Sequence, residues 1–146
     1  MTKKSGNREI NFSLPDLVDR LTIDQIKQIQ FEKTAKNYEK SINQIMKSID
    51  RIIIKKKIKI SDQLIIVLLN LSQINLYIWF LRKDLRTQKK PNSKKIKLSH
   101  QLNALRNQLK NRLYNLCFKK KSNSIEKKTN TNKEDLKGWK LNSLND

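Results

Sequence analysis

The sequence has 146 residues and carries 33 lysines and arginines against 13 aspartates and glutamates, which gives a formal net charge of +20 at pH 7. This length is typical of one domain, and the charge favours a polyanionic partner such as nucleic acid, a phosphorylated glycan or an anionic membrane surface. Gly6 and Gly138 are the only glycines, so glycine-dependent phosphate loops and β-hairpin arrays are excluded.

A short first helix is predicted from Ser13, which is a residue type that caps helix N-termini. Pro15 falls in the first turn, where its missing N–H costs nothing, and the negative charge of Asp16 is favourable there. The preceding residues 1–12 have a basic start with no apolar stretch behind it. We therefore expect them to form a flexible arm rather than a secretory signal.

A long second helix is predicted over 22–54. Thr22 and Gln25 have the spacing of a capping box, which indicates a new helix that starts at a bend. From Phe31 to Ile52, apolar side chains recur at alternating steps of four and three, a heptad-like spacing typical of a coiled coil. Because three helices need not cover the full length of this stripe, a homodimer through it is a further expectation.

The lysine-rich segment 55–63 leaves two alternatives, a helix end followed by a new cap at Ser61 or a short extended segment. Beyond it a third helix is predicted over 62–88. A fourth is predicted over 94–118, with Ser93 as its cap and leucines at steps of four and three facing a core.

The apolar run 64–81 is long enough for a membrane span and has lysines or arginines on both sides. Its polar residues are scattered around the helix, which is costly for an isolated span in lipid. A buried core helix is therefore favoured over a membrane span. Trp79 is then expected to pack against the leucines of the fourth helix, with Arg82 marking the end of the core.

No set of side chains has the spacing of a catalytic or metal site. His100 is the only histidine and has no second histidine or cysteine at a zinc-ligand spacing. Cys117 is the only cysteine, so no intrachain disulfide is possible, and it lies about five helical turns from His100. We expect no enzymatic activity, no metal and no cofactor, and a reducing cytoplasmic location.

One polar face of the fourth helix is a candidate anion-binding surface. Steps of three and four residues bring five side chains together there: His100, Asn103, Arg106, Asn107 and Lys110. The alternative is an ordinary solvated face, since helices in bundles normally have one side in water.

Lysine clusters are the second candidate for polyanion contacts. They comprise Lys55, Lys56, Lys57, Lys59, Lys94, Lys95, Lys119, Lys120 and Lys121. Contacts from these side chains to a phosphate backbone would make binding strongly salt-dependent. Two alternatives to such contacts remain open, because each cluster can be a soluble loop and the abundance of lysine, asparagine and isoleucine is also what an AT-rich genome produces.

Two stretches on consecutive predicted helices, "NLYIWFLRKDLR" and "LSHQLNALRNQLKNRL", resemble uncharacterised helical bacterial protein families of the DUF4254 and DUF6165 type. The similar positions are Trp79, Leu81 and Arg86 in the first stretch, and Asn103, Arg106 and Asn107 in the second. Phe80 stands where those families carry a histidine. Over about 14–116, the resemblance implies a soluble helical bundle with no settled activity and a link to surface-polysaccharide gene neighbourhoods.

Together these observations predict an all-α fold, an antiparallel helical bundle of three long helices plus a short N-terminal helix. The bundle would occupy 13–118, between the arm and a basic disordered tail over 119–146. The predicted function is non-enzymatic binding or scaffolding, with nucleic acid or another polyanion as partner. The alternatives are an accessory protein in surface-glycan synthesis and a single-pass membrane protein.

Overall fold

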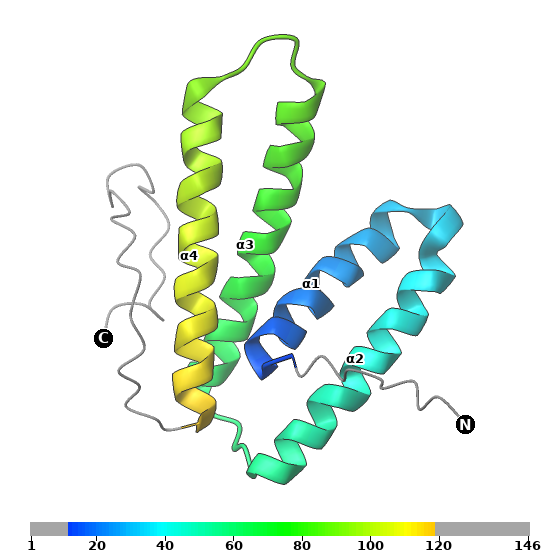
Figure 1. Ribbon diagram of the computed structural model, residues 1–146, viewed down its shortest axis with the longest axis vertical. Coiled ribbons are helices and arrows are strands. Elements are labelled where there is room, and N and C mark those ends of the chain that lie inside the picture. The colour runs from blue at the N-terminus through cyan, green and yellow to red at the C-terminus, as the bar shows by residue number, and fades with distance from the viewer. Residues whose placement is uncertain (1–11, 119–146) are drawn as a thin grey trace, which may run out of the picture.

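The computed structural model describes residues 12–118, which form an all-α bundle without strands in that range (Figure 1). Its elements are α1 (Leu14–Gln30), the 3₁₀ helix η1 (Glu32–Thr34), α2 (Ala35–Lys56), α3 (Asp62–Thr87) and α4 (Ser93–Phe118). The predicted all-α fold is confirmed. The predicted tail over 119–146, and the predicted arm apart from Phe12, lie outside the described residues.

The four helices form two hairpins that meet along α1 (Figure 1). α3 and α4 lie side by side over most of their length, and α1 packs on both of them as well as on α2. α2 packs mainly on α1. The N-terminal helix, which the sequence predicts to be short, is 17 residues long. Because it packs on α2, α3 and α4, it is the element that holds the two hairpins together.

The break between the first two helices is not where the sequence predicted it. Ser13 caps α1 as expected, with its hydroxyl accepting a hydrogen bond from the Asp16 N–H at 3.4 Å. Thr22 does not start a new helix, because α1 continues through it. Its hydroxyl donates to the Asp19 carbonyl at 2.8 Å, one turn earlier in the same helix. The chain bends instead between Phe31 and Thr34.

Segment 55–63 contains a helix end and a new cap, so the first of the two alternatives is confirmed. α2 ends in a Schellman motif, in which the Ile58 N–H donates to the Ile53 carbonyl at 3.1 Å and the Lys57 N–H donates to the Ile54 carbonyl at 3.2 Å. Lys57 has the left-handed conformation that this motif requires, with φ 51° and ψ 45°. The Ser61 hydroxyl then accepts from the Leu64 N–H at 3.1 Å and caps α3.

The cap of α4 is Asn92 rather than Ser93. The Asn92 side-chain oxygen accepts from the Lys95 N–H at 3.1 Å, and Ser93 is the first helical residue. Asparagine is as good an N-cap as serine, so the side-chain types alone did not distinguish the two positions.

The core lies between α1, α3 and α4. Six side chains are less than 2% exposed: Val67, Leu71, Ile74, Leu102, Leu109 and Leu113. Fully burying a side chain of this size stabilises a fold by about 1.5–3 kcal/mol, so the leucine stripe of α4 and the matching face of α3 supply much of the stability. Only Ile42 and Ile45 of the predicted stripe on α2 are buried, because α1 alone covers that helix closely.

Trp79 does not pack as the sequence predicted. Its ring meets that of Phe31 edge to face at a centroid distance of 5.8 Å, and Phe31 in turn contacts Tyr38. The side chain lies on the flank of α3 that faces the bend between α1 and α2, whereas Ile78 and Leu81 point into the core. Trp79 therefore packs against that bend and not against the leucines of α4.

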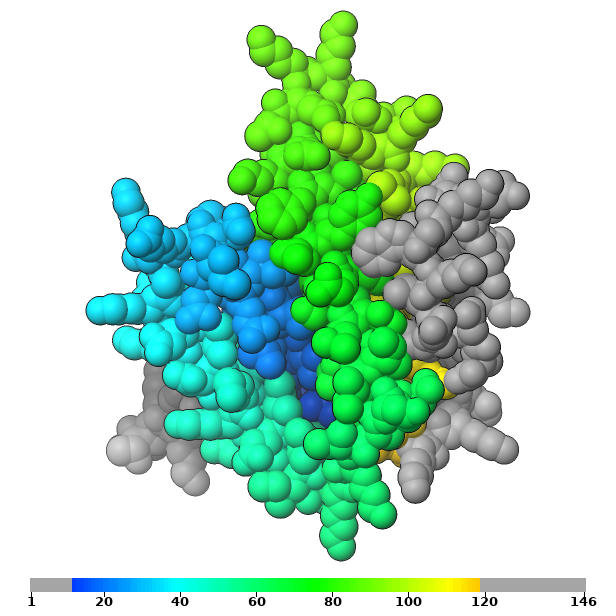
Figure 2. Space-filling model, turned by 180° about the vertical axis from the view of Figure 1, so that it is seen from behind, coloured from blue at the N-terminus to red at the C-terminus, as the bar shows by residue number. Residues whose placement is uncertain are grey.

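α3 is the one helix in residues 12–118 that is long and apolar enough to cross a membrane, by length and composition alone. Its core face is buried, but it also forms the surface along one side of the molecule (Figure 2). The exposed apolar side chains on this helix include Ile65, Leu69, Leu76 and Phe80.

Candidate functional site

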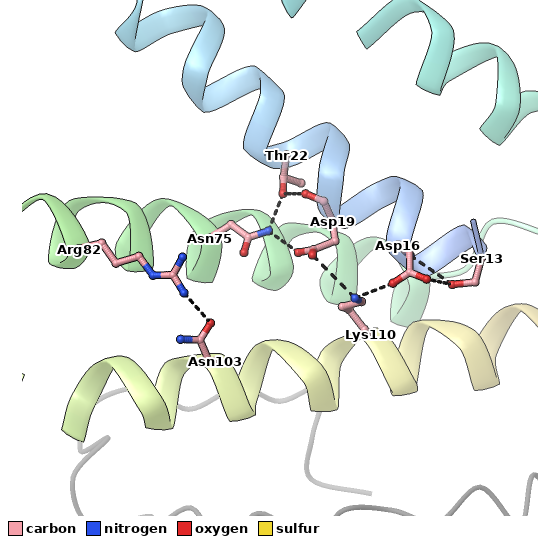
Figure 3. A network of polar contacts seen from close by, with 8 residues as sticks. All are labelled: Ser13, Asp16, Asp19, Thr22, Asn75, Arg82, Asn103 and Lys110. Atoms are coloured by element: carbon pink, nitrogen blue, oxygen red, sulfur yellow. Dashed lines mark hydrogen bonds and ion pairs between the residues drawn. The ribbon is translucent and has the colours of Figure 1, made fainter. Parts of the chain in front are cut away.

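A network of polar side chains joins α1, α3 and α4 where the two hairpins meet (Figure 3). Asn75 of α3 is 3% exposed, and its Nδ2 donates to Asp19 Oδ1 at 2.8 Å and to Thr22 Oγ1 at 2.6 Å. Lys110 of α4 approaches the same carboxylate, with Nζ 3.8 Å from Asp19 Oδ2. These residues, together with Asp16, are the interhelical polar cluster.

Lys110 also bonds to Asp16, whose carboxylate oxygen lies 2.6 Å from the ammonium nitrogen. The hydrogen bond from Lys110, helped by that from the Ser13 hydroxyl, lowers the pKa of Asp16 below its ordinary value of 3.8. Because one cation serves two carboxylates at the seam of three helices, the interhelical polar cluster fixes their relative positions.

The predicted polar face of α4 is divided between two roles. Lys110 is directed into the interhelical polar cluster and is not available as an open anion contact. Asn103 is half-buried, donates to the Ser99 carbonyl at 2.9 Å and accepts from Arg82 of α3 at 3.5 Å.

The other three members of that face differ in exposure. His100 and Asn107 lie in solvent, while Arg106 is partly buried. The Arg106 Nε atom has no hydrogen-bond partner within residues 12–118. Two of the five predicted side chains are therefore fully open to a ligand.

The lysine clusters lie at the two ends of α3. Lys55, Lys56, Lys57 and Lys59 are all exposed around the connection from α2 to α3. At the opposite end of α3, in the first turn of α4, Lys94 is exposed and Lys95 is partly buried. The Lys95 ammonium lies 3.4 Å from an Asp84 carboxylate oxygen.

Lys119, Lys120 and Lys121 lie outside the described residues. They follow Phe118 directly in the sequence, at the end of α4. The structure therefore describes six of the nine candidate lysines, and these lie near the two ends of α3.

A pocket that no sequence pattern indicated lies at the end of the bundle where α2 and α4 finish. Its volume is about 790 Å³. Its lining comes from the start of α1, from the segment 52–61 and from the last turns of α4. We call it the end pocket. No local pattern could have revealed it, because these three segments are far apart in the chain.

The end pocket combines apolar walls with a lysine-rich rim. Ile52, Ile58 and Leu116 are part of its apolar lining. The rings of Tyr114 and Phe118 contact each other on one side, tilted by 41° with their centroids 4.8 Å apart. The rim contains Lys56, Lys57 and Lys59.

Cys117 also lines the end pocket, and burial raises the pKa of its thiol. A thiol with a raised pKa is a weak nucleophile at neutral pH, because little of it is ionised. In the part of the chain that the structure describes, no group of three or more His, Cys, Asp or Glu side chains is placed to hold a metal ion. Comparison of the chain with protein-family models, with curated proteins and with solved structures gives no match.

Proposed function

We propose that the protein is a non-enzymatic helical binding protein whose lysine-rich surfaces engage a polyanion, with nucleic acid as the leading partner. The observation that carries this proposal is a gap in the acidic residues. Between Asp84 and Glu126 the sequence has no aspartate or glutamate, and this stretch supplies the turn after α3 and the whole of α4. This stretch therefore has no carboxylate of its own, and the pairs that Lys95 and Lys110 form use carboxylates of α3 and α1.

The turn between α3 and α4 and the first turn of α4 carry three exposed lysines of this surface. Lys89, Lys90 and Lys94 are exposed and form no ion pair within residues 12–118. Exposed ammonium groups attract phosphates without a fixed bidentate geometry, so this surface favours backbone contacts over base recognition. The expected binding is electrostatic and tolerant of sequence.

Binding of labelled RNA and DNA at rising salt concentration tests the proposal. The logarithm of the binding constant should fall linearly with the logarithm of the salt concentration, with a slope of about −0.7 to −0.9 for each phosphate contacted. Replacing Lys89, Lys90 and Lys94 by glutamine should make this slope shallower by about 2 to 3 if each contacts a phosphate.

A matched control removes the same charge elsewhere. Lys33, Lys36 and Lys40 are exposed near the start of α2, where Glu32 and Glu39 lie close in sequence. Their replacement by glutamine should leave the slope nearly unchanged. Equal effects of the two triple variants would refute a specific surface, and an absence of binding at low salt would refute the proposal altogether.

The membrane alternative has one observation in its favour, the length and hydropathy of α3. Against it stands Asn75, which lies within the predicted span 64–81 and bonds to two side chains of α1. We therefore propose that α3 is a core helix. Partition after cell lysis tests this: extraction only by detergent would contradict a bundle that is stable in water.

The proposed cytoplasmic location and the proposed homodimer rest on the sequence patterns given above. The homodimer is supported by two side chains on the flank of α2, Met46 at 53% and Ile53 at 39% exposure. Sedimentation analysis of the purified protein would test the dimer, and a monomer at all concentrations would exclude it.

A further inference from the structure

We propose that the end pocket binds an amphiphilic anion with a single aliphatic chain, the chain lying in the pocket and the carboxylate or phosphate head lying at its lysine rim. This proposal does not rest on polyanion binding, because it depends on the cavity at the end of the bundle, although Lys56, Lys57 and Lys59 also belong to the lysine clusters proposed for polyanion contacts.

The volume of the end pocket suits a small ligand. A volume of about 790 Å³ falls within the range of roughly 300–1,000 Å³ typical of small-molecule sites. An aliphatic chain gains about 0.8 kcal/mol for each CH₂ group that it buries, and the apolar lining provides surface for that burial.

The charges on the lining favour an anionic head. Lys56, Lys57 and Lys59 lie on the rim, and among residues 12–118 no aspartate or glutamate lines the pocket. None of these three lysines forms an ion pair within the described part of the chain. A ligand with a negative head and an apolar chain therefore matches both halves of the lining.

The backbone of Lys57 gives a second reason. Its left-handed conformation, with φ 51°, costs a residue other than glycine on the order of 1–2 kcal/mol. Glycine is the usual residue at this position of a Schellman motif. Glycine would be more stable at this position but would carry no ammonium group. We therefore interpret the lysine as a residue that places a positive charge at the rim, where it can bind an anion.

Titration of the full-length protein with myristate and with tetradecyl phosphate, both below their micelle concentrations, tests the proposal. Calorimetry reports the affinity, and the alkylation rate of Cys117 reports occupancy, because this thiol lines the end pocket and is the only one in the chain. At least one of the two amphiphiles should bind and slow alkylation, and the tighter of the two identifies the head group. Tetradecanol and inorganic phosphate should bind at least tenfold more weakly.

Two variants separate the end pocket from a non-specific apolar surface. Phe118→Ser removes an aromatic wall at the end of α4, where loss of the ring should not prevent folding. Phe80→Ser removes a ring of the same size from the exposed side of α3. Only the first should weaken amphiphile binding, by about tenfold or more, since burial of several CH₂ groups is lost.

The lysine rim is tested by Lys57→Gly, which removes the charge and suits the backbone. Circular dichroism should show an unchanged fold while affinity for the amphiphile falls several-fold. Equal affinity of the anions and tetradecanol, no protection of Cys117, or equal effects of Phe118→Ser and Phe80→Ser would each overturn the proposal. The Lys89, Lys90 and Lys94 triple variant should bind the amphiphile normally. Failure of the nucleic-acid proposal can therefore be told apart from failure of the amphiphile proposal.

Discussion

Lys110 of α4 and Asp16 of α1 form an ion pair with 2.6 Å between the ammonium nitrogen and a carboxylate oxygen. The Lys110 side chain is 23% exposed, and Asp19, its second partner, is 13% exposed. Removal of the ammonium therefore leaves two carboxylates close together, of which Asp19 is reached poorly by water while Asp16 is 44% exposed. Their mutual repulsion adds to the loss of the pair.

Lys110→Met is predicted to lower the free energy of unfolding by about 1 kcal/mol, because methionine keeps most of the aliphatic stem but provides no cation for Asp16 and Asp19. Urea denaturation followed by circular dichroism measures the change. Lys47→Met, at an exposed position of α2, is the control and should change stability by less than about 0.5 kcal/mol. Similar values for both variants would show that the pair contributes nothing specific.

Asp16 predicts a pH dependence of stability. Its pKa is lowered in the folded protein relative to the ordinary value of 3.8, chiefly by Lys110, so folding favours the ionised form. The resulting stabilisation is complete well above pH 3.8 and is lost as the pH falls through the lower folded pKa. Asp16→Asn should therefore flatten the acid side of the stability profile, and an identical profile would contradict this.

Asn75→Asp is predicted to destabilise the protein at neutral pH by about 3 kcal/mol, because it places a buried carboxylate against Asp19. Desolvation and the neighbouring charge would raise the pKa of the new carboxyl. Its penalty should shrink as the pH falls towards the point where it binds a proton. Unfolding measured at pH 7 and pH 5 tests this, and Asn70→Asp is the comparison on the same helix, where Asn70 is only partly buried.

Lys57→Gly is predicted to stabilise the protein by about 0.5–1 kcal/mol, because glycine takes the left-handed conformation without a Cβ clash. The entropy that glycine adds to the unfolded chain offsets part of the gain. Lys56→Gly, one residue earlier and still helical, should instead destabilise by up to about 1 kcal/mol. Thermal unfolding distinguishes the two signs, and a loss of stability in both would contradict the backbone explanation.

Local chemistry explains which parts of the fold could be predicted. The caps at Ser13 and Ser61 and the leucine stripe of α4 depend on neighbours within a few residues, so the sequence contains the whole signal. The prediction that a helix starts at Thr22 was wrong, because a threonine hydroxyl can either cap a helix or bond to a carbonyl inside one. Its second bond, from Asn75, comes from a helix far away in the chain.

The candidate sites were less predictable for the same reason. Helical spacing predicted that Asn103, Asn107 and Lys110 lie on one side of α4, but it could not show that Lys110 turns towards α1. The end pocket needs three segments to meet, and the pairing of Trp79 with Phe31 depends on the angle between the hairpins. Such contacts follow from tertiary packing, which periodicity within one helix does not describe.

The peripheral position of α2 has a consequence for how the protein opens. α2 packs mainly on α1. The Ser41 hydroxyl of α2 also donates a hydrogen bond to the Asp24 carboxylate of α1 at 2.6 Å. The α3–α4 hairpin has its own tightly packed interface. Amide protons of α2 should therefore exchange with solvent through a partial opening that leaves α3 and α4 protected, at a lower free energy than global unfolding requires. In such a state the end pocket would lose its α2 wall while the lysine-bearing turn between α3 and α4 stayed in place.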